Sequence, residues 1–384
     1  MRASLAGAFA LAIALAACAG RDKDEGEKPT ELTDIEQTIR VTKLWSAKLG
    51  GDAENLRLGL SPASDGPNIY AAAHDGHVTS FDAATGAERW RTELELPLAA
   101  GPGIGEELVV VGSTGGSVAA LSAGDGSVRW QRNLNAEILA RPLISGGRVF
   151  VRTVDGHVRA LDSASGNDAW TVQREMPRLS LRGNSTPVIA GNRLVVAFDD
   201  GKVAALELQN GDQDWESVIT PQRGRTEIDR LADVDADVRL VGNELYVVGF
   251  QSRAVRLTAD SGQEQWSVDL SSYEGPGVDW VHVYITDDKG EVVALDRASG
   301  AAVWRQSALR LRSVTGATPY GQAVVVGDYE GYLHWLSVDD GRIIGRVHAD
   351  GGAIGNPPLV VGDTLYAQTD GGILSAWSAV QPEQ

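Results

Sequence analysis

Short alternations of hydrophobic and polar residues recur along this chain in a unit of about 40 residues. A clear copy reads DGHVTSFDAATGAERWRTEL, in which Asp-Gly and Thr-Gly pairs bound the strand-like segments. Eight copies, two of them weak and the last truncated, start at Asp75, Gly115, Asp155, Asp200, Ser252, Lys289, Glu330 and Gly371. A unit repeated this often indicates architecture, because repeats build a fold by stacking on their neighbours.

Each copy divides into four short segments. In the second copy they are AGPGIG, ELVVVGS, SVAALSA and SVRWQRNL. All four are rich in Val, Ile, Leu or aromatic residues and are bounded by Gly, Asp and Ser, which is typical of strands. Asp-Gly or Gly-Gly separates segments two and three, and Thr-Gly, Ser-Gly or Asp-Gly separates three and four. These pairs suit tight hairpins, so the pattern predicts four antiparallel strands.

A marked position ends most copies four residues after a glycine, and successive marked positions lie 38 to 51 residues apart. They are Trp90, Trp130, Trp170, Trp215, Trp266, Trp304 and, in the seventh copy, Gly345. Four strands at this period predict a β-propeller blade, with a linear β-solenoid as the alternative. The last copy stops after its third strand near Val380, and Ile39 to Leu49 reads as an orphan fourth strand. We therefore expect an all-β, eight-bladed β-propeller over residues 39–380, closed by the N-terminal strand.

The recurring side chains have architectural roles in this reading. The tryptophans should pack between blades against a neighbouring glycine, and Asp75, Asp155 and Asp200 should cap turns. His74 and His77 raise the alternative of a metal site, but no third donor accompanies them. No serine nucleophile motif occurs, and the GPGIG stretch lies between strands instead of opening a helix. We expect no catalytic residue and no metal or other cofactor.

The N-terminal residues predict a targeting signal. Residues 1–17 combine Arg2 with a short apolar stretch, which predicts a signal peptide. Leu15-Ala16-Ala17-Cys18 resembles the bacterial lipobox, and Cys18 is the single cysteine of the chain. The alternative is an ordinary signal peptide that contains a cysteine. Ala19 follows Cys18, and by resemblance to bacterial sorting rules this favours the outer membrane.

The mature chain is acidic. Loss of Arg2 with the signal peptide would leave 33 basic against 52 acidic residues, a net charge of −19. Such a chain has no general affinity for phosphate backbones, which argues against nucleic acid as a partner. Residues 18–38 are polar and charged after the cysteine and predict a lipidated, flexible tether.

The repeat resembles the pyrroloquinoline-quinone-type propeller repeat, with its A-L-D-x-x-T-G-x-x-x-W core. Two kinds of protein use it: quinoprotein dehydrogenases, and the BamB family of lipoproteins in the bacterial β-barrel assembly machinery. Lipobox, length and eight copies resemble the BamB family over the whole mature chain. The dehydrogenases are typically longer, with a vicinal disulfide and a calcium site beside the quinone, and the only cysteine here is assigned to lipid. A quinoprotein dehydrogenase-like periplasmic enzyme is the alternative function.

Two consecutive connections between copies are extended. From the marked tryptophan to the start of the next inner strand the chain takes 12 residues in the first two copies. It takes 17 from Trp170 to Pro187 and 23 from Trp215 to Val238. Fourth-to-first connections of a propeller emerge on one face, so the two long loops should be neighbours there, where function tends to be found.

The two long loops contain MPRLSLRGNSTP and TEIDRLADVDADV. They are similar to the L-S-L-R-G and E-I-D-R-L-x-D-V-D segments of the BamB family. The resemblance implies docking on a periplasmic POTRA domain of the barrel-forming subunit, BamA. By position, the contact residues would be Leu179, Leu181, Arg182, Asp233 and Asp235.

Other interpretations of these residues stay open. Leu179 and Leu181 alternate as core residues of an incoming strand would. The Asp-Val-Asp-Ala-Asp run is similar to a calcium loop with Glu244 at its twelfth position, although Val238 stands where that loop needs glycine. Arg182 could pair with one of the aspartates inside the molecule.

The expected function is a non-enzymatic scaffold in the insertion of outer-membrane β-barrel proteins. The resemblance places it at the periplasmic face of the outer membrane, held by lipid, with BamA and other assembly subunits as partners. Unfolded outer-membrane clients could also bind by strand addition at blade edges.

Overall fold

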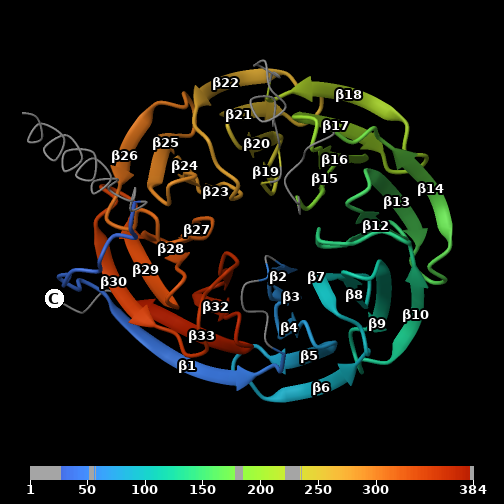
Figure 1. Cartoon of the computed structure of the whole chain (residues 1–384), viewed down its shortest axis with the longest axis horizontal. Helices are drawn as coiled ribbons and strands as arrows, with labels where there is room; N and C mark the ends of the chain where they lie inside the picture. Colours follow the sequence, from blue (N-terminus) through green and yellow to red (C-terminus); the bar gives the residue numbers. More distant parts are fainter. Residues whose placement is uncertain are drawn as a thin grey trace, which may run out of the picture.

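The computed structural model describes residues 27–51, 56, 58–177, 185–220, 234 and 236–380. Over these residues the chain forms eight sheets arranged around a central axis (Figure 1). In blades 1 to 7 four consecutive strands run from the axis outward, each antiparallel to the next. The predicted eight-bladed β-propeller is confirmed, and the linear solenoid is wrong.

The first four blades follow the chain order. Blade 1 contains β3 (Ala63–Ser64), β4 (Asn68–Ala72), β5 (His77–Asp82) and β6 (Glu88–Glu93). Blade 2 contains β7 (Leu98–Gly105), β8 (Leu108–Ser113), β9 (Ser117–Ser122) and β10 (Val128–Asn133). Blade 3 contains β11 (Leu143–Ser145), β12 (Arg148–Arg152), β13 (His157–Asp162) and β14 (Asp168–Gln173). Blade 4 contains β15 (Val188–Ala190), β16 (Arg193–Ala197), β17 (Lys202–Glu207) and β18 (Gln213–Val218).

The other four complete the ring. Blade 5 contains β19 (Arg239–Val241), β20 (Glu244–Val248), β21 (Arg253–Thr258) and β22 (Glu264–Asp269). Blade 6 contains β23 (Gly277–Val278), β24 (His282–Thr286), β25 (Val292–Asp296) and β26 (Ala302–Gln306). Blade 7 contains β27 (Thr318–Tyr320), β28 (Ala323–Gly327), β29 (Tyr332–Ser337) and β30 (Ile343–His348). Blade 8 contains β31 (Leu359–Val361), β32 (Thr364–Gln368), β33 (Ile373–Val380) and β1 (Arg40–Lys48).

The N-terminal strand closes the ring as the sequence predicts. β1 pairs antiparallel with β33, from Arg40 opposite Val380 to Lys48 opposite Ile373. It takes the outermost place in blade 8, which the other blades fill with their own fourth strand. The two ends of the propeller therefore share one sheet.

A short strand that the repeat pattern does not predict lies before blade 1. β2 (Gly59–Leu60) pairs in parallel with β7 and adds a fifth strand to blade 2. Gly59 permits this close approach, because a Cβ there would lie 2.3 Å from the carbonyl oxygen of Leu139.

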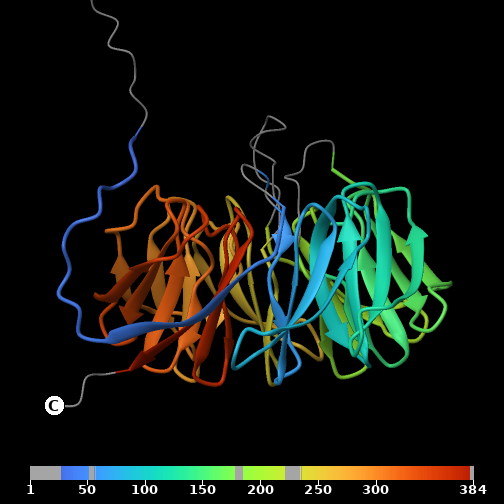
Figure 2. The same ribbon diagram turned by 90° about the horizontal axis from the view of Figure 1, so that it is seen from below.

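We name the two faces of the ring from Figure 2. The upper face carries the second-to-third turns, such as Asp75–Gly76 and Asp155–Gly156, together with the fourth-to-first connections. The lower face carries the first-to-second and third-to-fourth turns, such as the turn at Gly166. Both long loops of the sequence belong to connections of the upper face, β14 to β15 and β18 to β19.

Neighbouring blades are joined by one repeated contact. Each tryptophan of an outermost strand packs on a glycine of the next blade's third-to-fourth turn. The pairs are Trp45–Gly86, Trp90–Gly126, Trp130–Gly166, Trp170–Gly211, Trp215–Gly262, Trp266–Gly300 and Trp304–Gly341. In each pair the indole N–H also donates to a backbone carbonyl three residues before that glycine, at 2.8 to 3.2 Å. The expected packing of tryptophan against glycine is confirmed.

The missing tryptophan of blade 7 has a structural reason. Blade 8 is built from both ends of the chain, so it has no third-to-fourth turn and no turn glycine for a tryptophan to cover. The marked position of blade 7 is Gly345 instead, and the side chain of Ile39 fills its place, 2.8 Å from where a Cβ of Gly345 would lie.

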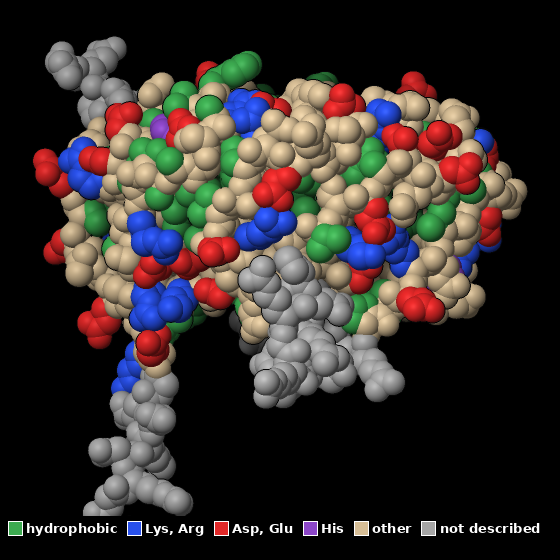
Figure 3. Space-filling view, turned by 90° about the horizontal axis from the view of Figure 1, so that it is seen from above, with side chains coloured by type: hydrophobic (Ala, Val, Ile, Leu, Met, Phe, Trp, Pro, Cys, Tyr) green, Lys and Arg blue, Asp and Glu red, His purple; other side chains and the backbone are tan. Residues whose placement is uncertain are grey.

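Hydrophobic side chains fill the wedges between adjacent sheets. One such cluster contains Tyr70 and Trp90 of blade 1 with Val109 and Leu121 of blade 2. On the outer wall, acidic and basic side chains lie next to one another in the view of Figure 3. Within the described ranges, no helix is long and apolar enough to cross a membrane.

Candidate partner-binding surface on the upper face

The site residues expected from the sequence all fall on segments outside the described residues. These are Cys18 at the N-terminus, Leu179, Leu181 and Arg182 of the first long loop, and Asp233 and Asp235 of the second. The structure describes the stems on which both loops stand, and those stems determine where the loops start and end.

Arg174 fixes the leading stem of the first loop to blade 4. It follows β14, and its guanidinium donates to Glu216 Oε2 and to Gln213 Oε1, each at 2.6 Å. The same guanidinium lies over the ring of Phe198 at 4.4 Å. Burial alone would raise the pKa of Glu216, but hydrogen bonds from Lys202 and Arg174 lower it below the ordinary value. Glu216 therefore stays ionised and holds the stem.

The returning stems of the two loops are bonded to each other. The backbone N–H of Thr186 donates to Asp237 Oδ1 at 2.6 Å. Thr186 precedes β15, and Asp237 precedes β19. Val234, Ala236 and Val238 are buried around Asp237, so the second stem is packed into the body of the propeller. The bond fixes the exits of both loops relative to each other.

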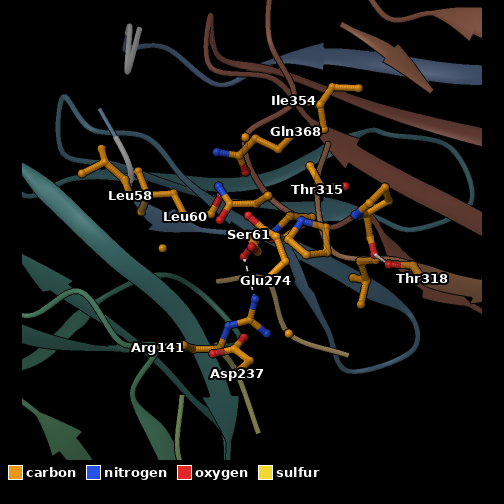
Figure 4. A pocket seen from close by; sticks show the side chains of 18 of the residues that line it. Leu58, Leu60, Ser61, Arg141, Asp237, Glu274, Thr315, Thr318, Ile354 and Gln368 are labelled. Carbon is orange, nitrogen blue, oxygen red and sulfur yellow. Dashed lines mark hydrogen bonds between the residues drawn. The ribbon is translucent and has the colours of Figure 1, made fainter. Parts of the chain in front are cut away.

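A cavity of about 1420 Å³ opens along the axis beside these stems. In Figure 4, Arg141 and Asp237 extend toward each other on its wall. Arg141 donates to the carbonyl of Ser61 at 3.4 Å. Asp237 is accessible to water through the cavity, yet the surrounding protein displaces bulk solvent and raises its pKa, against the effect of the bond from Thr186. The same desolvation lowers the pKa of Arg141.

The aspartates of the second-to-third turns cap those turns, as expected from the sequence. Oδ1 of Asp75 accepts from the backbone N–H of His77 at 3.3 Å, and Asp155 and Asp200 make the same contact in their turns. The Nδ1 of His77 lies 2.9 Å from Asp75, while His74 contacts the carbonyl of Leu98 at 2.7 Å. These contacts account for the histidine pair, and the described residues hold no cluster of three or more potential metal ligands.

The calcium-loop alternative places Glu244 at the end of the loop. In the structure Glu244 starts β20 at the lower face, and its carboxylate binds Arg256 and Arg297. Val238 at the glycine position is buried at 4% exposure. Glu244 is thus engaged with two arginines, away from the upper face.

One polar cluster escaped the sequence analysis. Under the upper face of blade 7, the fully buried His334 and Asp328 lie 3.0 Å apart. Arg346 Nε donates to His334 Nδ1 at 3.2 Å, so the Nε2 of the neutral ring carries the proton toward Asp328. Burial lowers the pKa of His334 and keeps it neutral. The sequence signal for this cluster is a histidine, His334, at an inward-facing position of a strand.

Comparison with known protein families agrees with the fold. A family model described as outer membrane protein assembly factor BamB matches residues 74–306 and 288–382. The BamB of Pseudomonas aeruginosa is 44% identical over 373 residues, covering 96% of this chain and 97% of the relative. That of Kangiella koreensis is 44% identical over 356 residues, covering 92% of this chain and 91% of the relative.

Solved structures give the same architecture. The crystal structure of BamB from Moraxella catarrhalis is similar with a TM-score of 0.80 and 29% identity, covering 88% of this chain and all of that one. A quinohemoprotein alcohol dehydrogenase from Pseudomonas putida has a TM-score of 0.68 at 13% identity, covering 90% of this chain and 77% of that one. At that identity the second likeness shows the propeller fold alone.

Proposed function

The chain belongs to the BamB family of outer membrane protein assembly factors, and from that premise we propose that its two long upper-face loops dock on a periplasmic POTRA domain of BamA. Family membership makes the chain a non-enzymatic assembly factor of the β-barrel assembly complex that associates with the outer membrane. Our proposal goes beyond family membership in naming BamA as the subunit that this chain contacts and the two loops as the segments that make the contact.

The observation that carries the proposal is the pairing of the two stems. Thr186 and Asp237 are hydrogen bonded at 2.6 Å, which brings the exits of consecutive loops together on one face. Arg174 holds the entrance of the first loop to blade 4. Stems held in fixed positions restrict where the two loops can extend, and such restriction lowers the entropy lost on binding.

The loop residues supply complementary chemistry. Arg182 can place a planar, permanently charged fork on a partner carboxylate or carbonyl, which a lysine would not reproduce. Leu179 and Leu181 supply apolar contact. Asp233 and Asp235 either bind the partner or position Arg182.

Loop substitutions test the docking site. Arg182→Glu, and separately the pair Leu179→Ala with Leu181→Ala, should weaken binding of purified BamA POTRA domains at least tenfold, because truncating a central contact costs roughly 1–4 kcal/mol. Binding is measured by calorimetry, with the thermal midpoint of each variant recorded alongside. The control is Glu137→Ala in the connection between blades 2 and 3.

Unchanged binding by all loop variants would move the docking surface elsewhere on the ring. Unfolding of the leucine pair would instead assign Leu179 and Leu181 to the core. Asp233→Ala with Asp235→Ala should weaken binding less than Arg182→Glu if these carboxylates mainly position the arginine.

We further propose that residues 1–17 are removed as a signal peptide and that Cys18 carries the lipid anchor. Cys18→Ser should abolish incorporation of labelled palmitate and move the protein from the membrane fraction to the soluble periplasmic fraction. The wild-type chain expressed in parallel is the control. Membrane association that survives the substitution in the absence of BamA would disprove the anchor.

A further inference from the structure

The segment before β1 lies against the propeller instead of trailing free. We call Glu27–Thr38 the strap. It runs along the outer side of blade 7, from the lower face, where β1 begins, to the upper face (Figure 2). At its lower end the N–H of Thr38 donates to the carbonyl of Ile344 at 2.9 Å. At its upper end the N–H of Thr30 donates to the carbonyl of Arg310 at 3.0 Å.

Arginines of blade 7 and of the connection that leads into it hold the strap backbone. Arg312 Nη1 donates to the carbonyl of Thr30 at 3.0 Å, and Arg346 Nη1 donates to that of Thr33 at 2.8 Å. Arg312 is only 2% exposed, and its other donors bind Asp328 and Glu330. The docked strap thus completes the hydrogen bonding of a buried guanidinium whose other donors bind carboxylates.

Side chains of the strap add to this attachment. Glu27 pairs with Arg310 at 2.6 Å, and Gln37 donates to the carbonyl of Arg346 at 3.3 Å. Leu32 packs against the hydrophobic cluster between blades 6 and 7. The strap therefore combines backbone, ionic and apolar contacts along its whole length.

Two of the arginines that hold the strap are linked by a buried network centred on blade 7. His334 connects Arg346 to Asp328, and Asp328 connects in turn to Arg312. At the position of His334, three residues after the second-to-third turn, the other copies carry Thr79, Ala119, Arg159, Ala204, Val255, Val293 and Ser375. The described strands thus carry this histidine-centred network on blade 7 alone, beneath the strap.

We propose that the strap sets which face of the propeller meets the membrane. Because the strap crosses blade 7, the chain that leads to Cys18 leaves from the upper face at Glu27. Nine residues separate Cys18 from Glu27, which at full extension reach ~30 Å. The upper face, with its docking loops, is therefore held toward the lipid surface and within that distance of it. This inference rests on the proposed lipid anchor at Cys18.

A chain without a docked strap would behave differently. The free tether would then extend from Cys18 to Ile39 at the lower face, and 21 residues reach ~70 Å. Such a tether would leave the propeller free to present either face. The two arrangements are distinguishable because the faces lie at least a six-residue strand apart, ~20 Å.

The first experiment tests strap docking without any membrane. In the Cys18→Ser protein, spin labels at Glu31→Cys on the strap and Lys289→Cys on the upper face of blade 6 should give a narrow distance distribution. Leu32→Asp with Glu27→Ala should broaden it, whereas Glu36→Ala, at an exposed position of the strap, should leave it narrow. A broad distribution in the parent protein would overturn the docked strap.

The second experiment measures orientation with the acylated full-length chain in vesicles of outer-membrane phospholipid. Cys18 is then blocked, so a fluorophore attaches only to Lys289→Cys on the upper face or Trp280→Cys on the lower face of the same blade. Trp280 is 91% exposed, so its replacement should not disturb packing. Energy transfer to a lipid-bound acceptor should be at least twofold stronger from position 289.

The strap-release variant should bring the two efficiencies together. Equal efficiencies in the parent protein, or stronger transfer from position 280, would overturn the inference. Palmitate labelling of the same samples reports the anchor separately. A chain that fails to acylate contradicts the proposed anchor, while the spin-label distances still decide whether the strap is docked.

Discussion

At the scale of single residues, contacts between blades depend on a tryptophan indole that packs against a glycine, which has no side chain in the way. Gly166 has φ +71° and lies under Trp130, and a Cβ there would lie 2.7 Å from the indole. Glycine is thus required at this position for two reasons: its positive φ, and the room that the indole of Trp130 occupies. The 2.8 Å bond from the indole N–H to Ser163 fixes the ring in place.

A pair of glycine substitutions separates these two needs. Gly191 has φ +63° but a Cβ there would meet nothing within 4 Å. Gly191→Ala should cost about 1–2 kcal/mol of unfolding free energy for the left-handed conformation alone. Gly166→Ala should cost about 1–3 kcal/mol more, because the methyl group also overpacks the indole. Urea denaturation of the two variants measures the difference, and equal losses would show that the indole moves aside at no cost.

The sequence predicted the tryptophan contacts because the glycine and tryptophan recur at fixed spacing. It did not explain why the seventh copy carries Gly345. That reason depends on the ring being closed between Val380 and Arg40, where a turn is absent, and on Ile39 lying there. A pattern within each copy cannot report a contact that exists only between the two ends of the chain.

At the scale of elements, β1 completes blade 8, and the strap precedes it. Trp45 of β1 packs on Gly86 of blade 1 and donates to the carbonyl of Ala83 at 3.0 Å. β1 therefore supplies both the edge strand of one blade and the contact to the next. The strap supplies neither, because it forms no strand and contacts blade 7.

Nested truncations of the Cys18→Ser protein distinguish the two elements. A chain starting at Gly50 lacks β1 and with it the partly buried Trp45, a loss of about 3–5 kcal/mol. At ~2–4 °C per kcal/mol its thermal midpoint should fall by roughly 10 °C or more. A chain starting at Ile39 lacks only the strap and should lose less than half of that. Calorimetry checks both, and similar midpoints for the two would contradict the closing role of β1.

The elements that the sequence missed are those without a periodic pattern. β2 has two residues, and its parallel pairing with β7 depends on Gly59 meeting Leu139 of another blade. Residues 18–38 were expected to form a flexible tether on composition alone, yet the strap within them makes the contacts described above. Polar composition does not reveal that arginines far along the chain donate hydrogen bonds to its backbone carbonyls.

At the scale of the whole molecule, the two faces of the ring are unequal. The upper face carries the connections β14 to β15 and β18 to β19, the stem bond between Thr186 and Asp237, and the exit of the strap. The proposed docking loops and the proposed anchor therefore share a face, across the ring from each other. The partner domain would then lie between the propeller and the membrane.

The pairing of β1 with β33 also has a consequence for the order of folding. Seven of the eight blades join residues that are close in sequence, so they can form as the chain emerges. Arg40 can pair only after Val380 has been synthesised. Bringing such distant segments together costs more loop entropy than any other pairing in the described sheets. We therefore expect ring closure to be the last step, and a chain cut short anywhere before β33 would leave β1 unpaired. The N-terminal strand thus acts as a test of completeness for the propeller, satisfied only once β33 has been made.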